Sequence, residues 1–297
     1  MIRLLLPVFL LILLARPAAA SLERGLAAYE ADDYEAAYAA FEPLAASGNP
    51  EAQYWLGRLY DAGLGVGSNP ATALDWFRKA AQQGHPEAQR VVGIYYEEGK
   101  GIARSYEQAA RWYAQAVEQG NVKAMRNLGL LYQDGRGVEP DPEKAVSLYR
   151  QASGAGSAKA KRNLAYMYYF GAGVRRDLEQ AALLFSGAAE ADLGKAKFDL
   201  GRLYYRGQGV ERDVARAAGL FMAAAEEGHG RAQLFLGRMH LLGEGVEQDD
   251  VKAYAWLTLA SAQEPESAAK LMASLNGKLS AEERAKAEEF ARGFRPR

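Results

Sequence analysis

Residues 52–87 read AQYWLGRLYDAGLGVGSNPATALDWFRKAAQQGHPE, and this stretch of 36 residues decides the fold. The same pattern returns five more times without an insertion or deletion. Alanine opens every copy, at positions 52, 88, 124, 160, 196 and 232. Because a fixed period of this length is typical of repeat proteins, the sequence predicts an array of six blocks: 52–87, 88–123, 124–159, 160–195, 196–231 and 232–267.

Each block has two amphipathic segments separated by a glycine turn. In the first block Ala52, Leu56 and Tyr60 recur at the spacing of one helix face, as do Ala73 and Phe77 in the second segment. The turn is Gly-x-Gly followed by an apolar residue in every copy, and glycine reaches backbone conformations that strain other residues. Neither helix buries its apolar face alone, so the sequence predicts antiparallel helix pairs stacked into an α-solenoid.

The segments that flank the six blocks are shorter. Residues 21–51 keep the frame of the second half of a repeat and are predicted to form a degenerate first repeat. Residues 268–297 are predicted to close the array with capping helices, at about 266–276 and 280–292. Ser280 followed by Glu283 has the spacing of a capping box at the start of the last helix.

Residues 1–20 have the pattern of a cleaved secretory signal peptide. Arg3 precedes an apolar run from Leu4 to Leu14, and the small residues Ala18 to Ala20 follow. The run has about half of the ~20 residues that cross a bilayer. We therefore expect cleavage after Ala20 and export to a bacterial periplasm or the medium, without stable membrane insertion. An uncleaved anchor is the alternative.

The repeated motifs match a known family. The pattern Ala-x-x-x-Leu-Gly-x-x-Tyr, Gly-x-Gly-Val, Ala-x-x-Trp-Phe/Tyr-x-x-Ala-Ala-x-x-Gly resembles that of Sel1-like repeats, which are related to tetratricopeptide repeats. The resemblance covers 52–267, while 21–51 looks more like a tetratricopeptide unit. It implies an all-α fold, a right-handed α-solenoid that binds other proteins, with motif residues that are structural and bring no catalytic site.

The composition excludes several functional classes. The chain has 297 residues and no cysteine, so it has no disulfide framework, thiolate metal site or cysteine nucleophile. Its formal charge is −1, and loss of the two arginines in residues 1–20 makes it −3. A balance this close to neutral argues against a dedicated nucleic-acid binder, which usually has a strong basic excess.

Patterns of catalytic chemistry are weak in this chain. His85, His229 and His240 belong to no HExxH or similar metal-binding motif. Ser267 and Lys270 fit the Ser-x-x-Lys pattern of penicillin-recognising enzymes, but its Ser-Asp-Asn and Lys-Thr-Gly partners are missing. The Gly-x-Gly turns follow helices and lack the Gly-Lys-Ser/Thr ending of a P-loop. We therefore expect no catalytic residue, no metal and no cofactor.

Two aromatic columns recur in register and are predicted to pack in the core, because the apolar stripe of a helix normally faces its neighbour. The first holds tryptophan in three blocks and leucine in the others. The second holds tyrosine in five blocks. The residues are Trp76, Trp112 and Trp256 in the first column, and Tyr60, Tyr96, Tyr132, Tyr168 and Tyr204 in the second.

The concave face is the remaining candidate site. In the related tetratricopeptide solenoid the first helix of each pair lines the groove, and the corresponding positions carry a net charge of −3 in the first two blocks and +8 in the other four. Arginine forks and aromatic rings there suit an acidic, partly apolar protein segment. A solvated face that keeps the array soluble is the alternative. The predicted partner-binding residues are Arg126, Arg162, Tyr166, Tyr169, Phe170, Phe198, Arg202, Tyr205, Arg206 and Arg238.

The function predicted from these features is a non-enzymatic protein-interaction scaffold or regulator of the bacterial cell envelope. An alternative is recognition of an anionic envelope polysaccharide or peptidoglycan by the same arginine and aromatic residues. A more remote alternative is a cell-wall or β-lactam hydrolase, for which Glu87, Glu97 and Glu98 are the only dense acids in the groove.

Overall fold

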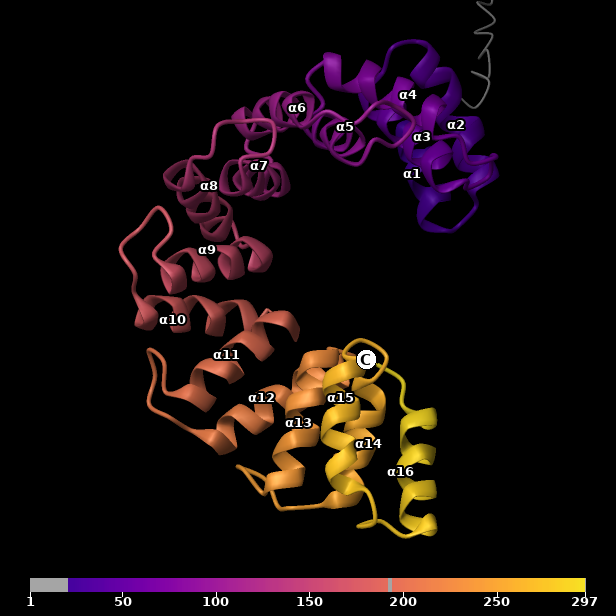
Figure 1. Cartoon of the computed structure of the whole chain (residues 1–297). Coiled ribbons are helices and arrows are strands. Elements are labelled where there is room, and N and C mark those ends of the chain that lie inside the picture. Colours follow the sequence, from indigo (N-terminus) through magenta and orange to yellow (C-terminus); the bar gives the residue numbers. More distant parts are fainter. Residues whose placement is uncertain (1–20, 192–193, 297) are drawn as a thin grey trace, which may run out of the picture. The chain divides into compact units, whose positions relative to one another are not determined.

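The computed structural model describes residues 21–191 and 194–296. These residues form sixteen α-helices and one short 3-10 helix, with no strand (Figure 1). The all-α fold expected from the repeats is therefore confirmed. The predicted signal peptide, residues 1–20, lies outside the described residues.

The chain divides into two compact units, residues 1–112 and 113–297, which are described separately. Helix α6 (Tyr106–Glu118) crosses the boundary between them. The other helices of the first unit are α1 (Leu22–Glu30), α2 (Tyr34–Ala46), α3 (Pro50–Ala62), α4 (Pro70–Gln82) and α5 (Pro86–Glu98). Helices α1 and α2 form the helix pair that the sequence predicts for residues 21–51.

The second unit continues the pairs and adds the C-terminal helices. In each repeat the odd-numbered helix comes first and packs against the even-numbered helix that follows it. The helices are α7 (Val122–Asp134), α8 (Pro142–Gly154), α9 (Ala158–Phe170), α10 (Leu178–Ala189), α11 (Gly194–Arg206), α12 (Val214–Glu226), α13 (Gly230–Leu242), α14 (Asp250–Ala260), α15 (Pro265–Met272) and α16 (Ala281–Gly293).

Polar caps and glycines set the ends of the helices. Before α3, Oδ1 of Asn49 accepts the N–H of Ala52 at 2.9 Å, which satisfies one donor that the helix itself leaves unpaired. The helix ends at Gly63, whose φ of 71° is left-handed and favours glycine. The second glycine of the turn has a different purpose. A Cβ on Gly65 would lie 2.6 Å from the carbonyl oxygen of Tyr34, at the start of α2, so this glycine lets successive repeats approach closely.

One aromatic column fills the core of the pairs. Phe41, Phe77, Phe185 and Phe221 are each at most 2% exposed. Facing Phe77, a Cβ on Gly57 would lie 2.7 Å from the ring, so the small residue of the first helix makes room for it. Burial of one such ring stabilises the fold by about 2–3 kcal/mol.

The two aromatic columns predicted for the core are only partly inside it. Trp256 is 5% exposed, as expected, but Trp76, Trp112 and the five tyrosines are only half-buried. Three of the tyrosine hydroxyls have polar partners: Tyr60 lies 3.3 Å from the Tyr38 hydroxyl, and Tyr96 and Tyr168 each accept a hydrogen bond from an arginine at 2.8 Å. A phenol needs a polar partner or water, which explains why this column lies at the edge of the core.

The C-terminal helices cap the last pair. The first of them, α15, is shorter than predicted and runs into a 3-10 helix at Ala273–Leu275. Helix α16 begins at the expected capping box, in which Ser280 and Glu283 bind reciprocally. None of the helices in the described residues is long and apolar enough to cross a membrane.

Candidate functional site

The ten predicted contact residues all lie in the second unit, on the first helices of its repeats. Arg126 is on α7, Arg238 is on α13, and the others are on α9 and α11. Steps of four residues, such as Arg162, Tyr166 and Phe170 on α9, place side chains on one face of a helix. The fold therefore brings most of these residues to one side of the second unit.

The charge of Arg162 is not free, because a buried acid compensates it. Its Nε donates to Oδ2 of Asp199 at 2.6 Å, and the Tyr166 hydroxyl donates to Oδ1 at 2.5 Å. Asp199 is only 4% exposed. Burial, together with this carboxylate, raises the pKa of Tyr166, so the phenol stays protonated as a donor.

Asp199 corrects the charge count made from the sequence. It lies on α11 directly after Phe198, at the position held by Asn127 and Asn163 in the two preceding repeats. That position was not among those counted for the groove. A polar residue recurring in one column was the only signal that could have identified it. The basic face is less positive than its counted positions indicate.

A second tyrosine reaches into the glycine turn of the next repeat. The hydroxyl of Tyr205 donates to Oε2 of Glu244 at 2.5 Å, and this hydrogen bond raises the pKa of Tyr205. Arg238 donates to the Tyr205 hydroxyl at 3.3 Å and lies 4.0 Å from Glu244. In the preceding repeat, Tyr169 donates in the same way to Gln208 at 3.0 Å. Arg238 is therefore also partly compensated.

The exposed part of the site is aromatic and cationic. Phe170 is 69% exposed, and its ring stacks on Tyr166 with centroids 6.0 Å apart and meets the edge of Tyr169 at 4.9 Å. Arg202 is half-buried and Arg206 is exposed. We call this set the aromatic–arginine surface; it consists of Tyr166, Tyr169, Phe170, Arg202, Tyr205, Arg206 and Arg238.

Phe198 does not belong to this surface, and its prediction as a contact residue is wrong. It is 4% exposed and packs against Phe221 in the core. Its ring also stacks on His229, the residue that precedes the next first helix, with centroids 4.6 Å apart. The side chain two positions after the leading alanine therefore points at the following repeat, where it is covered.

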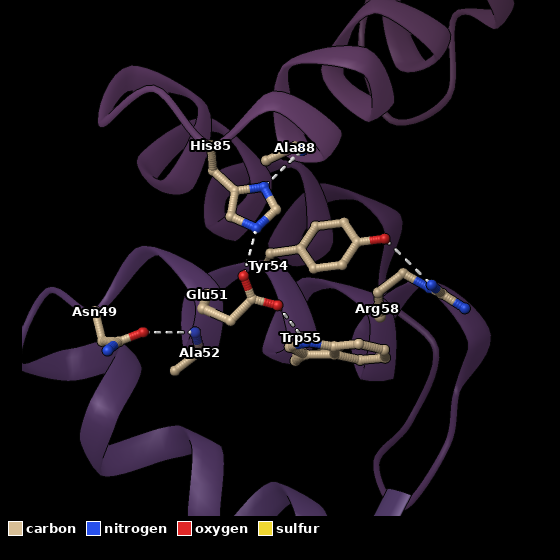
Figure 2. A network of polar contacts seen from close by, with 8 residues as sticks. All are labelled: Asn49, Glu51, Ala52, Tyr54, Trp55, Arg58, His85 and Ala88. Carbon is tan, nitrogen blue, oxygen red and sulfur yellow. Dashed lines mark hydrogen bonds and ion pairs between the residues drawn. The ribbon is translucent and has the colours of Figure 1, made fainter. Parts of the chain in front are cut away.

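The first unit has the same arrangement, with an acid added (Figure 2). Tyr54, 6% exposed, stacks on His85 at 4.8 Å. Nδ1 of His85 accepts the N–H of Ala88 at 3.0 Å and so caps α5, while Nε2 lies 2.9 Å from Oε2 of Glu51. The other Glu51 oxygen accepts the indole N–H of Trp55 at 2.7 Å. These groups, drawn in Figure 2, bind one another and hold consecutive repeats together.

His229 repeats the capping contact of His85 in the second unit. Its Nδ1 accepts the N–H of Ala232 at 3.2 Å. Burial lowers its pKa, Asp199 raises it, and Arg162 and Lys195 lower it further. The sequence places both histidines between repeats but does not identify them as caps, a position more often held by Ser, Thr, Asp or Asn.

The residues considered for catalysis are not arranged as an active site in the described part of the chain. Ser267 and Lys270 are exposed on α15. Glu87 accepts two hydrogen bonds from Arg90, at 2.8 and 3.0 Å. No group of three or more histidine and carboxylate side chains in the described ranges is arranged to hold a metal ion. The partner-binding role of the predicted surface residues remains a prediction.

Comparison with known proteins identifies the repeats. The family model described as Sel1 repeat matches residues 50–85, 86–121, 122–157, 158–193, 194–229 and 230–265. These blocks have the 36-residue period found in the sequence, and each begins two residues before its repeated alanine.

Solved structures give the same result. A Sel1 repeat protein from Oxalobacter formigenes is 34% identical, with a TM-score of 0.77 over 83% of this chain and 98% of its own. A protective antigen of uropathogenic Escherichia coli strains, displaying an SLR fold, is 27% identical, with a TM-score of 0.53 over 91% of this chain and 82% of its own. No curated protein matches the chain.

Proposed function

The chain belongs to the Sel1 repeat family, and we propose that its second unit binds an acidic, partly apolar segment of a protein partner. Sel1 repeat proteins mediate protein–protein interactions. In this chain the partner would bind to the aromatic–arginine surface. After removal of residues 1–20 the protein would act in the bacterial cell envelope, as a scaffold or regulator without catalytic activity.

The observation that carries the proposal is the exposure of Phe170 beside cationic side chains. A phenylalanine that is 69% exposed leaves most of its ring in water, which is unfavourable by about 25 cal/mol for each Å² of apolar surface. The Phe170 ring stacks on Tyr166 and packs edge-to-face with Tyr169. A rigid aromatic anchor of this kind, with arginine nearby, is the usual centre of a protein interface.

The arginines of the surface differ in availability. Arg202 and Arg206 make no hydrogen bond or ion pair with the residues that the structure describes, whereas Arg238 is shared with Tyr205 and Glu244. A guanidinium whose N–H groups make no hydrogen bond binds a carboxylate through two parallel N–H groups. An acidic residue next to an apolar one in the partner would therefore meet Arg202 or Arg206 while its neighbour covers Phe170.

Site-specific photo-crosslinking in the exported protein tests this function. A photoreactive phenylalanine analogue at position 170 should capture one protein partner, and the capture should weaken when Arg202→Glu and Arg206→Glu are combined. The matched control places the analogue at Leu183, which is 66% exposed on the second helix α10. Equal capture at both positions, or capture unaffected by the charge reversal, would contradict the proposal.

The same protein can be used to test the alternative that the surface binds a glycan. Salt-sensitive binding of purified peptidoglycan or anionic polysaccharide to the aromatic–arginine surface, with no protein captured at position 170, would replace the protein partner by a glycan.

A further inference from the structure

A separate cavity in the second unit has the character of an anion site. Its volume is about 550 Å³, within the range of small-molecule pockets. It lies where the first helices α9, α11 and α13 begin, and a side chain from α7 also reaches it. Its lining includes the polar side chains of Arg126, Lys159, Arg162, Asn163, Lys195 and Glu227.

The lining is strongly positive. Four of its side chains are cations and Glu227 is its one acid, which gives the lining a formal charge of +3. Glu227 is already paired, since its Oε1 lies 2.6 Å from Nζ of Lys197. Arg162 is paired with Asp199. Of the four cations, Lys159 and Lys195 make no ion pair with any described residue.

A buried donor in the lining has no acceptor. Nε of Arg126 is buried and finds no hydrogen-bond partner among the described residues. Burial raises the pKa of Tyr149, and the Asn163 amide, which lies beside the hydroxyl of that phenol, lowers it. A buried donor without an acceptor is destabilising, and such groups in native proteins usually mark a place where water, an ion or a ligand binds.

A neutral donor completes the wall. The ring of His229 lines the cavity, and its Nδ1 is occupied as the acceptor of the Ala232 N–H. The proton of the neutral ring is therefore on Nε2, which is available to donate. The cavity thus offers N–H donors and cations, and the acid in its wall is already paired.

We propose that this cavity binds a small molecule carrying a multiply charged oxyanion, such as a phosphoryl group or clustered carboxylates. Oxyanions accept from several donors at once, and charge-assisted hydrogen bonds to arginine and lysine are the strong ones. The site is distinct from the aromatic–arginine surface, since none of the side chains of that surface lines it. The small-molecule site therefore does not depend on the protein partner proposed above.

Titration calorimetry on the exported chain tests the site with two probes, inorganic pyrophosphate and citrate, at constant ionic strength. Saturable binding of one ion per chain supports the proposal. Binding of pyrophosphate alone identifies a phosphoryl ligand, binding of citrate alone a polycarboxylate, and binding of both the shared chemistry. If neither probe binds saturably up to about 10 mM, the proposal is wrong. A dissociation constant above that concentration corresponds to a binding free energy weaker than ~3 kcal/mol.

Variants distinguish binding in the cavity from non-specific binding to surface charge. Lys159→Gln and Lys195→Gln should each weaken binding about tenfold, and both residues are exposed, so the fold tolerates the change. Arg231→Gln is the matched control, because Arg231 occupies the same position in the next repeat but does not line the cavity. Equal loss of affinity in Lys195→Gln and Arg231→Gln would overturn the proposal even if the probes bind.

Discussion

Nε2 of His85 lies 2.9 Å from Oε2 of Glu51, across the step from one repeat to the next (Figure 2). Four repeats later the same two positions hold His229 and Lys195. Both histidines cap a first helix through Nδ1, but the position that holds Glu51 beside His85 holds Lys195 in the repeat of His229. His229 therefore lacks the carboxylate partner of His85 and is affected by Asp199, Arg162 and Lys195 instead.

His229 should make the folded protein less stable in acid. Burial lowers its pKa below the usual value of 6.5, so the unfolded chain binds its proton more readily. Its contribution to the free energy of unfolding is complete above that value and is lost as the pH falls through the lowered pKa.

The measurement compares His229→Asn with the wild type by urea unfolding at about pH 7.5 and about pH 5, on either side of the usual histidine pKa. Asparagine keeps the cap, as Asn49 and Asn121 do in other repeats. The variant should lose less stability on acidification than the wild type. An equal or larger loss in the variant would show that His229 does not titrate in this way.

Asp199→Asn should destabilise the second unit by about 1–3 kcal/mol. The substitution keeps the volume of the side chain and removes the charge that compensates Arg162 at 2.6 Å. It also leaves the Tyr166 hydroxyl with a weaker acceptor. Glu139→Gln is the control, because Glu139 is exposed on a loop and its change should cost less than about 0.5 kcal/mol. Similar losses in the two variants would mean that the buried carboxylate contributes no more than a surface acid.

The repeat period predicted most of the fold. A constant step of 36 residues fixed the number of helix pairs, and the glycine turns fixed where first helices end, as at Gly63. The capping box at Ser280 was predicted from local spacing alone. These features depend on residues close in sequence, so a one-dimensional pattern contains them.

The site was harder to predict because its geometry depends on how one repeat stacks on the next. In the sequence Phe198 stands four residues before the cation Arg202, a spacing that suggests one exposed helix face. In the structure the next repeat covers its ring. Asp199 and Arg162 are 37 residues apart, and nothing in either helix indicates that they meet. The helical period defines the faces of one helix and leaves open which part of a face its neighbour covers.

Gly173→Ala should destabilise the protein more than Gly156→Ala. Both glycines have left-handed φ values, 64° and 89°, so alanine costs about 1 kcal/mol of backbone strain at either position. At position 173 a Cβ would also lie 2.4 Å from the carbonyl oxygen of Pro142, at the start of α8, whereas at position 156 it meets nothing within 4 Å.

The difference in the free energy of unfolding between these two variants therefore measures the close approach of successive repeats. We expect about 1–3 kcal/mol, the usual cost of overpacking. Urea unfolding of both variants gives this value directly. A difference near zero would mean that the turn shifts to accommodate the methyl group and that the second glycine is needed only for its backbone conformation.

Phe290 and Phe294 cover Trp256 at the end of the array. Trp256 meets the edges of Phe290 at 5.4 Å and Phe294 at 5.8 Å, and a terminal repeat without such cover would leave its apolar face in water. Phe294→Ala should lower the free energy of unfolding by about 1–2 kcal/mol and shift tryptophan emission to the red. Leu183→Ala, at a site that is 66% exposed, should change stability by less than about 0.5 kcal/mol and leave the emission unchanged. If Phe294→Ala behaves like Leu183→Ala, the last helix pair does not depend on Phe294 for its cover.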